Sequence, residues 1–87
     1  MHYVYLIRSE RSKGNKELYV GCTDDIKRRI DEHNAGRSAY TSGSGKWKLI
    51  YCEVFRSKED AVKREKALKN FGAAYGHLKR RLRESLQ

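Results

Sequence analysis

Two apolar segments near the start of the chain are separated by a short polar stretch, and this spacing constrains the fold more than any other feature. Residues 2–8 (HYVYLIR) and 17–22 (ELYVGC) are rich in the β-branched and aromatic side chains that favour strands. Residues 9–16 between them are polar and include the turn signal Gly14-Asn15. This connection is too short for the helical crossover that parallel strands need. The sequence therefore predicts an antiparallel hairpin.

Two later segments have the pattern of capped helices. Residues 26–34 (IKRRIDEHN) follow Thr23 and Asp24, either of which can cap a helix, and precede Gly36, a residue suited to end one. Residues 57–70 begin with a serine cap that is followed three positions later by an aspartate. Both segments carry apolar residues at helical spacing, so we expect each helix to bury one face.

The remaining segments complete an α+β fold. Residues 47–55 (WKLIYCEVF) predict a third strand, and apolar residues on both of its faces indicate helices above and below the sheet. Strict alternation places four large side chains on one face of this strand: Trp47, Leu49, Tyr51 and Phe55. Leucines at every fourth position predict a third helix over residues 73–87. We expect a single domain, residues 1–87, with a small three-stranded antiparallel sheet flanked by helices in the order β-β-α-β-α-α. We expect residues 71–87 to provide its basic C-terminal helix.

The charge balance points to a polyanionic partner. The chain has 20 Lys and Arg against 11 Asp and Glu, a net charge of +9 over 87 residues, and nucleic acid is the usual partner of such a domain. A merely solvated basic surface is the alternative. With no long apolar run and no signal-peptide pattern, we expect no membrane span and a cytoplasmic location. We also expect a monomer. The two cysteines are expected to be free thiols, and no zinc site is expected.

Three side chains suggest chemistry, each with a plainer alternative. Arg29 and His33 are four positions apart and share a helix face, which is either functional or only solvated. Glu65 lies within the apolar stripe of its helix, where a carboxylate must be paired or coordinated. A salt bridge is the more common outcome there, and a metal ligand is the functional one.

A series of short motifs runs in a fixed order along the chain. The motifs are Tyr3-Val4-Tyr5, Tyr19-Val20-Gly21, Thr23, Arg29-x-x-x-His33, Ala39-Tyr40-Thr41, Leu49-Ile50-Tyr51 and the segment 60–65 (DAVKRE). Their order and spacing resemble the GIY-YIG nuclease superfamily, which includes the N-terminal domain of the UvrC repair nuclease. The chain is most similar to the small stand-alone bacterial proteins of the YhbQ or UPF0213 type. It departs from the family at Tyr3, which replaces a glycine, and at Cys22, where UvrC-type domains have a lysine. The family's asparagine beyond the metal-binding glutamate has no clear counterpart.

The resemblance implies hydrolysis of phosphodiester bonds with one divalent metal ion. In that scheme Glu65 holds Mg²⁺ or Mn²⁺ on the phosphate, and Arg29 contacts the scissile phosphate. Tyr5 is the general base or orients the attacking water, and Tyr19 completes the network. A free phenol titrates at about 10, so Tyr5 needs the cation and Arg29 nearby to favour phenolate. His33 carries protons or orients its neighbours.

Nucleic-acid contacts are expected around this site. Tyr40 stands between Arg37 and Lys46 in a Gly/Ser-rich segment, either as an anchor to the core or as a nucleic-acid contact. With Arg28 and Lys69 these residues form the expected binding set. The first hypothesis is a metal-dependent endonuclease acting on DNA. The alternative, which the missing lysine and asparagine favour, is a nucleic-acid-binding module on the same fold with weak or lost catalysis. A basic ribosome-associated protein without a site is a third, more remote hypothesis.

Overall fold

The most apolar stretch of the chain forms the central strand of the sheet. The computed structural model describes residues 1–9, 18–35, 46–70 and 72–85. β2 (Leu18–Thr23) and β3 (Trp47–Phe55) flank β1 (His2–Ser9) in the order β2-β1-β3, and both pairs are antiparallel. A central strand covered on both faces needs apolar residues at consecutive positions. Accordingly, four in a row are buried: Val4, Tyr5, Leu6 and Ile7.

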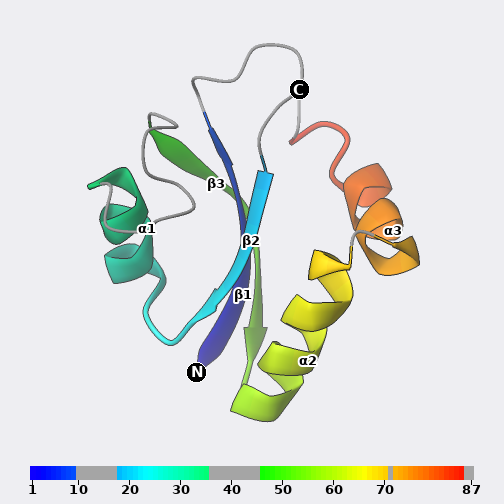
Figure 1. The fold of residues 1–87 in the computed structure, drawn as a ribbon, viewed down its shortest axis with the longest axis horizontal. Coiled ribbons are helices and arrows are strands. Elements are labelled where there is room, and N and C mark those ends of the chain that lie inside the picture. The colour runs from blue at the N-terminus through cyan, green and yellow to red at the C-terminus, as the bar shows by residue number, and fades with distance from the viewer. Residues whose placement is uncertain (10–17, 36–45, 71, 86–87) are drawn as a thin grey trace.

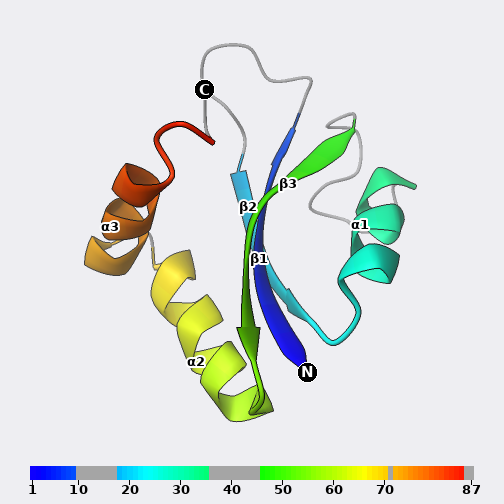
Figure 2. The same cartoon turned by 180° about the vertical axis from the view of Figure 1, so that it is seen from behind.

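Helices cover both faces of this sheet (Figures 1 and 2). α1 (Ile26–Asn34) lies on one face, whereas α2 (Lys58–Lys69) and α3 (Ala73–Arg81) lie on the other. The predicted α+β fold, its element order β-β-α-β-α-α and its antiparallel hairpin are therefore confirmed. Among the described residues, none of the helices has the length and apolar character needed to cross a membrane.

Alternate side chains of β1 belong to two separate cores. The core on the α2–α3 side contains Val4, Leu6, Val20, Ala61, Leu68 and Leu78. The core on the α1 side contains Tyr5, Ile7 and Trp47, with Tyr19, Ile26 and Ile30 packed against it. Tyrosine and tryptophan combine an apolar ring with a polar group that seeks a hydrogen bond. The α1 side is therefore the face of the sheet that can hold polar chemistry.

The N-cap of α1 is Asp25, and the prediction of Thr23 or Asp24 as the cap is wrong. The Asp25 carboxylate accepts a hydrogen bond from the Arg28 backbone N–H at 3.1 Å. Thr23 instead supports the preceding turn, because its Oγ1 accepts a hydrogen bond from the Asp25 N–H at 3.1 Å. The predicted stop signal, Gly36, lies outside the described residues.

The other two helices meet their predicted boundaries only in part. Ser57 caps α2 as predicted and accepts a hydrogen bond from the Asp60 N–H at 3.4 Å. The helix predicted over residues 73–87 ends earlier, at Arg81, and residues 82–85 form a turn. Leu82 still packs against the α2–α3-side core, but residues 83–85 are exposed. A short helical extension without a packed face has little to stabilise it.

The alternation predicted for β3 is wrong because this strand contains a β-bulge. The register between β1 and β3 shifts between Leu6 and Ile7, which leaves Ile50 as an extra residue in β3. One extra residue turns the following side chains to the opposite face. Trp47, before the bulge, therefore packs in the α1-side core, whereas Tyr51, after it, packs against the α2–α3-side core.

Candidate active site

Side chains from β1, β2 and α1 meet on the α1 side of the sheet. The Tyr5 hydroxyl lies 2.8 Å from Nε2 of His33, and both residues are buried. The ring centroids of Tyr19 and His33 are 5.1 Å apart, and those of Tyr5 and Tyr19 are 6.3 Å apart. Both tyrosines face the same side of the sheet, because the side chain of each points into the α1-side core. Three of the five residues predicted to be catalytic are thus in one cluster.

Gly21 makes room for the Tyr5 side chain. The two residues are direct partners across the β1–β2 pair. A Cβ atom added to Gly21 would overlap the ring and hydroxyl of Tyr5. The phenol therefore extends over the backbone of β2, where any larger residue would block it. This close approach explains in physical terms why a glycine occupies this position of the strand.

The surroundings of Tyr5 and His33 favour the neutral form of both side chains. Burial raises the pKa of the Tyr5 phenol to about 12, although a hydrogen bond with Arg29 acts in the opposite direction. Burial, and then the charge of Arg29, lower the pKa of His33 below its ordinary value. A guanidinium can only donate, so the Tyr5 oxygen accepts from Arg29. In the Nδ1–H tautomer of a neutral His33, Nε2 accepts the Tyr5 hydrogen; in the other tautomer Nε2 donates to the Tyr5 oxygen. The phenolate form of Tyr5 is not favoured by these surroundings.

Arg29 lies between the buried pair and solvent. Its guanidinium hydrogen-bonds with Tyr5, and its Nη1 donates to Glu32 Oε1 at 3.2 Å. Burial alone would lower the pKa of Arg29, but these two partners raise it. The Arg29 side chain is 31% exposed, whereas Tyr5 and His33 are each 1% exposed. Arg29 therefore presents a fixed positive charge at the surface of the cluster.

Glu65 and Lys69 approach the same place from α2, on the other side of the sheet. Lys69 Nζ lies 3.4 Å from Glu65 Oε2 and 5.3 Å from the centroid of the Tyr19 ring. The negative charge of Glu65 also contributes to the raised pKa of Tyr5. Because β2 is an edge strand, α2 side chains can reach its open side. We call this group the β2-edge cluster: Tyr5, Tyr19, Arg29, His33, Glu65 and Lys69.

Of the two alternatives for Glu65, the structure shows the salt bridge, and the metal ligand stays a prediction. Its side chain is only 20% exposed, and it is paired with Lys69 one helical turn away. Among the described residues, no three His, Cys, Asp or Glu side chains group together to hold a metal ion. Mg²⁺ often binds through one or two carboxylates and takes its remaining oxygens from water and substrate phosphate. Glu65 fits a cation of this kind together with a bound phosphate, once Lys69 moves aside.

The residues predicted to contact nucleic acid are more scattered. Lys69 belongs to the β2-edge cluster. Arg28 is exposed on α1 and its Nη2 lies 3.1 Å from Asp24 Oδ1. Lys46 is exposed directly before β3. Two members of the set lie outside the described residues: Arg37 and Tyr40.

Two supporting residues were missed by the sequence-based site prediction. Gly21 stands in a motif, but its role depends on the register that places it opposite Tyr5. The Trp47 ring centroid lies 6.5 Å from that of Tyr19. The backbone N–H of Trp47 also donates to Asn34 Oδ1 at 2.6 Å, which ties the start of β3 to the end of α1. Contacts between residues so far apart in the chain leave no local pattern in the sequence.

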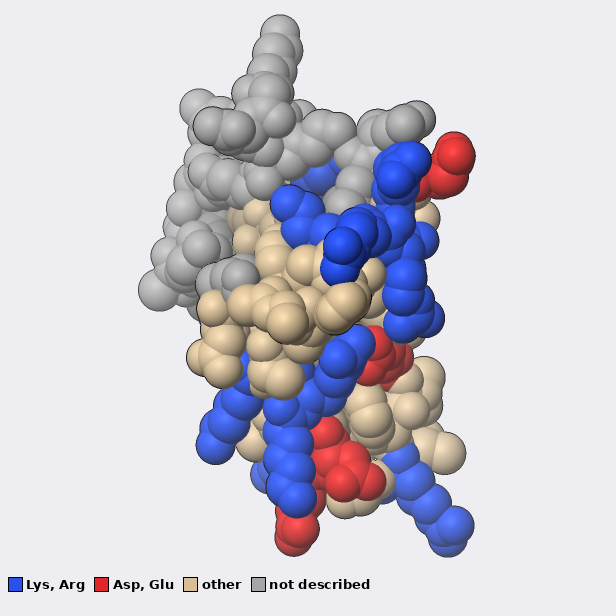
Figure 3. Space-filling view, turned by 90° about the vertical axis from the view of Figure 1, so that its right-hand side faces the viewer, with Lys and Arg blue, Asp and Glu red and all other residues tan. Residues whose placement is uncertain are grey.

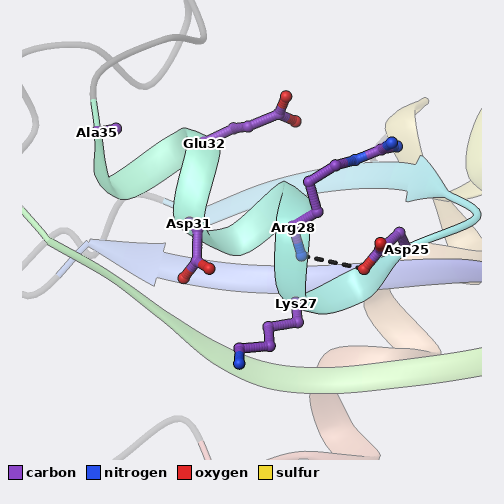
Figure 4. A pocket seen from close by; sticks show the side chains of 6 residues that line it. All are labelled: Asp25, Lys27, Arg28, Asp31, Glu32 and Ala35. Atoms are coloured by element: carbon purple, nitrogen blue, oxygen red, sulfur yellow. Dashed lines mark hydrogen bonds between the residues drawn. The ribbon is translucent and has the colours of Figure 1, made fainter.

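A hollow of about 460 Å³ on the outer side of α1 does not belong to this cluster (Figure 4). Its lining consists of Asp25, Lys27, Arg28, Asp31, Glu32 and Ala35. Acidic side chains there outnumber basic ones, which does not suit a polyanion. Figure 4 shows the Arg28 backbone nitrogen turned towards the Asp25 carboxylate, the contact that caps the helix. None of the five predicted catalytic residues lines this hollow.

Comparison with known proteins identifies the family. The model of the GIY-YIG catalytic domain matches residues 1–80. The chain belongs to this family. The GIY-YIG domain is 44% identical to a UPF0213 protein of Halobacterium salinarum over 75 residues, 85% of this chain and 92% of that protein. It is 38% identical to a UPF0213 protein of Haloquadratum walsbyi over 71 residues, 80% of this chain and 75% of that protein.

The solved structures include a similar chain, the solution NMR structure of a UPF0213 protein from Bacillus halodurans. It is 36% identical in sequence and has a TM-score of 0.47, and the match covers 98% of this chain and 80% of that one. The predicted family, GIY-YIG with UPF0213 relatives, is confirmed by the sequence matches. Membership of the GIY-YIG family indicates a nuclease.

Proposed function

We propose that the protein is a divalent-metal-dependent endonuclease that hydrolyses phosphodiester bonds in DNA, with the β2-edge cluster as its active site. The observation that carries the proposal is the layering of this cluster. Tyr5 and His33 are each 1% exposed, whereas the side chains of Arg29 and Glu65 are 31% and 20% exposed. A proton-accepting pair therefore lies behind charged groups that face solvent. Membership of the GIY-YIG family supports the same chemistry.

The inner layer accepts the proton of the attacking water. Water passes a proton to the Tyr5 oxygen while the Tyr5 hydroxyl passes its own proton to Nε2 of His33, 2.8 Å away. The lowered pKa of His33 keeps the imidazole neutral and able to accept it. This relay avoids a free phenolate, which the raised pKa of Tyr5 disfavours. The water oxygen bonds to phosphorus as the ester bond breaks, and the leaving oxygen takes a proton from solvent.

The outer layer holds the phosphate. Arg29 faces the place where negative charge develops on the phosphoryl oxygens, and Tyr19 orients the phosphate and water beside it. Glu65 would hold Mg²⁺ or Mn²⁺, and the ion, when bound, would supply Lewis-acid stabilisation of that charge. Lys69 leaves Glu65 and pairs with the substrate backbone.

A nucleic-acid-binding module without catalysis is the second candidate, and the Lys69–Glu65 pair favours it. With the ammonium 3.4 Å from the carboxylate, the charge of Glu65 is partly neutralised. A phosphate backbone then meets little repulsion even when no metal ion is bound. Both functions need nucleic-acid binding, but only the nuclease needs Glu65 as a ligand.

Cleavage assays with a charge-matched pair of variants separate the two functions. Labelled single-stranded, duplex and branched DNA, with RNA in parallel, is incubated with Mg²⁺ or Mn²⁺ and with a chelator. Glu65→Gln keeps the size of the side chain and should lower the metal-dependent cleavage rate by about 100-fold or more. The control is Glu59→Gln, an exposed carboxylate on the same helix, which should cleave like wild type.

Each outcome assigns the function. Metal-dependent cleavage that is lost in a folded Glu65→Gln protein, as checked by circular dichroism, supports the nuclease. A Glu65→Gln protein that cleaves as fast as wild type contradicts the proposed metal ligand. DNA binding by all variants with cleavage by none assigns the protein to the binding-module class.

A further inference from the structure

A second hollow, of about 410 Å³, opens beside the β2-edge cluster. Its walls come from the start of β1, the end of β2, one side of α1 and the first turn of α2. Arg29 belongs both to this wall and to the cluster, so the hollow adjoins the candidate active site at Arg29. Lys58, the first residue of α2, contributes the lining from the other side of the sheet.

Among the described residues, some charged side chains in this hollow are ion-paired and one is not. It is lined by Arg28, Arg29 and Lys58 and by the carboxylates of Asp24 and Glu32. Each carboxylate already pairs with an arginine, at 3.1 Å for Asp24–Arg28 and 3.2 Å for Glu32–Arg29. Lys58 has no ion pair with any residue in the part of the chain that the structure describes. The Arg28 and Asp24 side chains are 60% and 68% exposed, so an incoming phosphate can take over Arg28 at little cost.

We propose that this hollow binds the backbone phosphate next to the one that is cleaved, with Lys58 as its principal cation. The inference rests on the proposed function, because it takes Arg29 as the contact of the scissile phosphate. A DNA strand that places one phosphate against Arg29 also places the next phosphate beside the wall of the hollow, because Arg29 is part of that wall. The ammonium of Lys58 is the group there that still lacks a counter-charge. A free phosphate has the same chemistry, and the experiment separates it from the backbone.

General attraction to a basic surface is the competing explanation for any effect of Lys58. Lys and Arg side chains are spread over the face formed by α2 and α3, with Asp and Glu between them (Figure 3). Lys63 is an exposed lysine of the same helix that does not line the hollow. Lys58→Met and Lys63→Met remove the same charge from the same helix, so their difference reports on the hollow.

Fluorescence anisotropy with a short labelled oligothymidylate measures the effect. Binding is recorded over a range of NaCl concentrations with chelator present, so that no strand is cut. Lys58→Met should weaken binding by about three- to tenfold and reduce the slope of log affinity against log salt by about one. Lys63→Met should change both quantities by clearly less. Equal effects of the two variants would overturn the proposal.

Inorganic phosphate and thymidine 5′-monophosphate, used as competitors, test the source of the phosphate. Neither competitor should displace the oligonucleotide when it is present at concentrations near the dissociation constant of the oligonucleotide. If either does so in wild type but not in Lys58→Met, the hollow is a free-phosphate site and the backbone proposal fails. The Glu65→Gln cleavage assay is independent. A Lys58-specific binding loss without any metal-dependent cleavage keeps the hollow as a site for a backbone phosphate and contradicts the nuclease, so that no neighbouring phosphate is cleaved. Normal cleavage with equal lysine effects keeps the nuclease and overturns the site at Lys58.

Discussion

Tyr5 has three neighbours that fix its hydroxyl in place. Arg29 donates to the oxygen, His33 Nε2 shares a hydrogen bond with it at 2.8 Å, and Gly21 leaves the space that the ring crosses. The hydroxyl is therefore oriented before any substrate binds, which is the preorganisation that electrostatic catalysis requires. Losing any one neighbour should affect catalysis through the position or the proton affinity of this one group.

The pH dependence of cleavage should follow His33 and not Tyr5. Below the lowered pKa of His33 the imidazole carries a proton and cannot accept another, so the rate should fall as the pH drops through the acid range. If Tyr5 instead acted as a free phenolate, the rate would keep rising with pH towards about 12. Single-turnover rates of wild type from acid to alkaline pH check this, with circular dichroism at each pH to confirm folding. A rate that keeps climbing through the alkaline range would contradict the relay.

Replacing Gly21 by alanine should displace Tyr5. The added methyl group overlaps the phenol, so either the ring or the backbone of β2 must move. We expect a loss of about 1–3 kcal/mol in the free energy of unfolding and a large loss of cleavage. Urea unfolding and cleavage rates measure the two effects.

Gly76→Ala is the matched control for this substitution. Gly76 lies in α3, and a Cβ atom there meets nothing within 4 Å. Alanine favours a helix more than glycine does, so this variant should gain about 0.5–1 kcal/mol and cleave normally. Equal behaviour of the two alanine variants would show that Tyr5 does not need the space at Gly21.

α2 is held against β3 by a bidentate ion pair. Arg64 Nε and Nη2 donate to the two carboxylate oxygens of Glu53, each at 2.9 Å, and the Tyr51 hydroxyl donates to Glu53 at 2.9 Å. Burial would raise the pKa of Glu53, but these partners outweigh it and hold the pKa below its ordinary value. Glu65 follows Arg64 directly in the chain, so this clamp also sets where the proposed metal ligand lies.

Glu53→Gln should destabilise the fold in a pH-dependent way. Because the folded-state pKa of Glu53 is lowered, its contribution is present above the ordinary carboxyl pKa and is lost as the pH falls through the folded value. At neutral pH we expect a loss of about 1–3 kcal/mol. Urea unfolding at neutral and acidic pH measures this, and the gap from wild type should narrow in acid. Glu84→Gln, an exposed carboxylate after α3, should change little. A gap that does not depend on pH would contradict the assignment to Glu53.

The whole molecule uses its C-terminal helix as part of the core and not only as a basic surface. Leu78 of α3 is 1% exposed and packs in the same core as Val4 and Leu68. A chain this short buries little apolar surface in total, so each large core side chain matters. The basic residues of α3 are carried by a helix that the fold itself needs.

Leu78→Ala should therefore cost about 2–5 kcal/mol, a large share of the stability of a small domain. Thermal and urea unfolding measure the loss. Leu49→Ala serves as control, because Leu49 is 40% exposed and should lose about 1 kcal/mol or less. Equal losses in the two variants would mean that α3 contributes only surface charge.

Much of this protein was predictable from the sequence because the signals are local. Strand and helix segments follow from residue type and spacing within each segment, and the hairpin follows from the length of one connection. The family follows from short motifs in a fixed order, and the match over residues 1–80 confirms it. Tyr5, Tyr19, Arg29, His33 and Glu65 were selected on the same basis. Tyr5, Tyr19 and His33 are in contact, Arg29 adjoins Tyr5, and Glu65 is linked to them through Lys69, although the catalytic roles of all five stay predictions. The metal ion, the DNA substrate and the monomeric state also stay predictions.

Tertiary structure alone decided the features that depend on register and burial. The bulge at Ile50 arises where β1 and β3 pair, and it places the β3 side chains that follow it on the opposite face of the sheet. Lys69 reaches Tyr19 because β2 is at the edge of the sheet. Burial removes the water that would solvate a phenolate or an imidazolium, so it raises the pKa of Tyr5 and lowers that of His33. These effects join residues far apart in the chain, and a sequence pattern records only the neighbours along it.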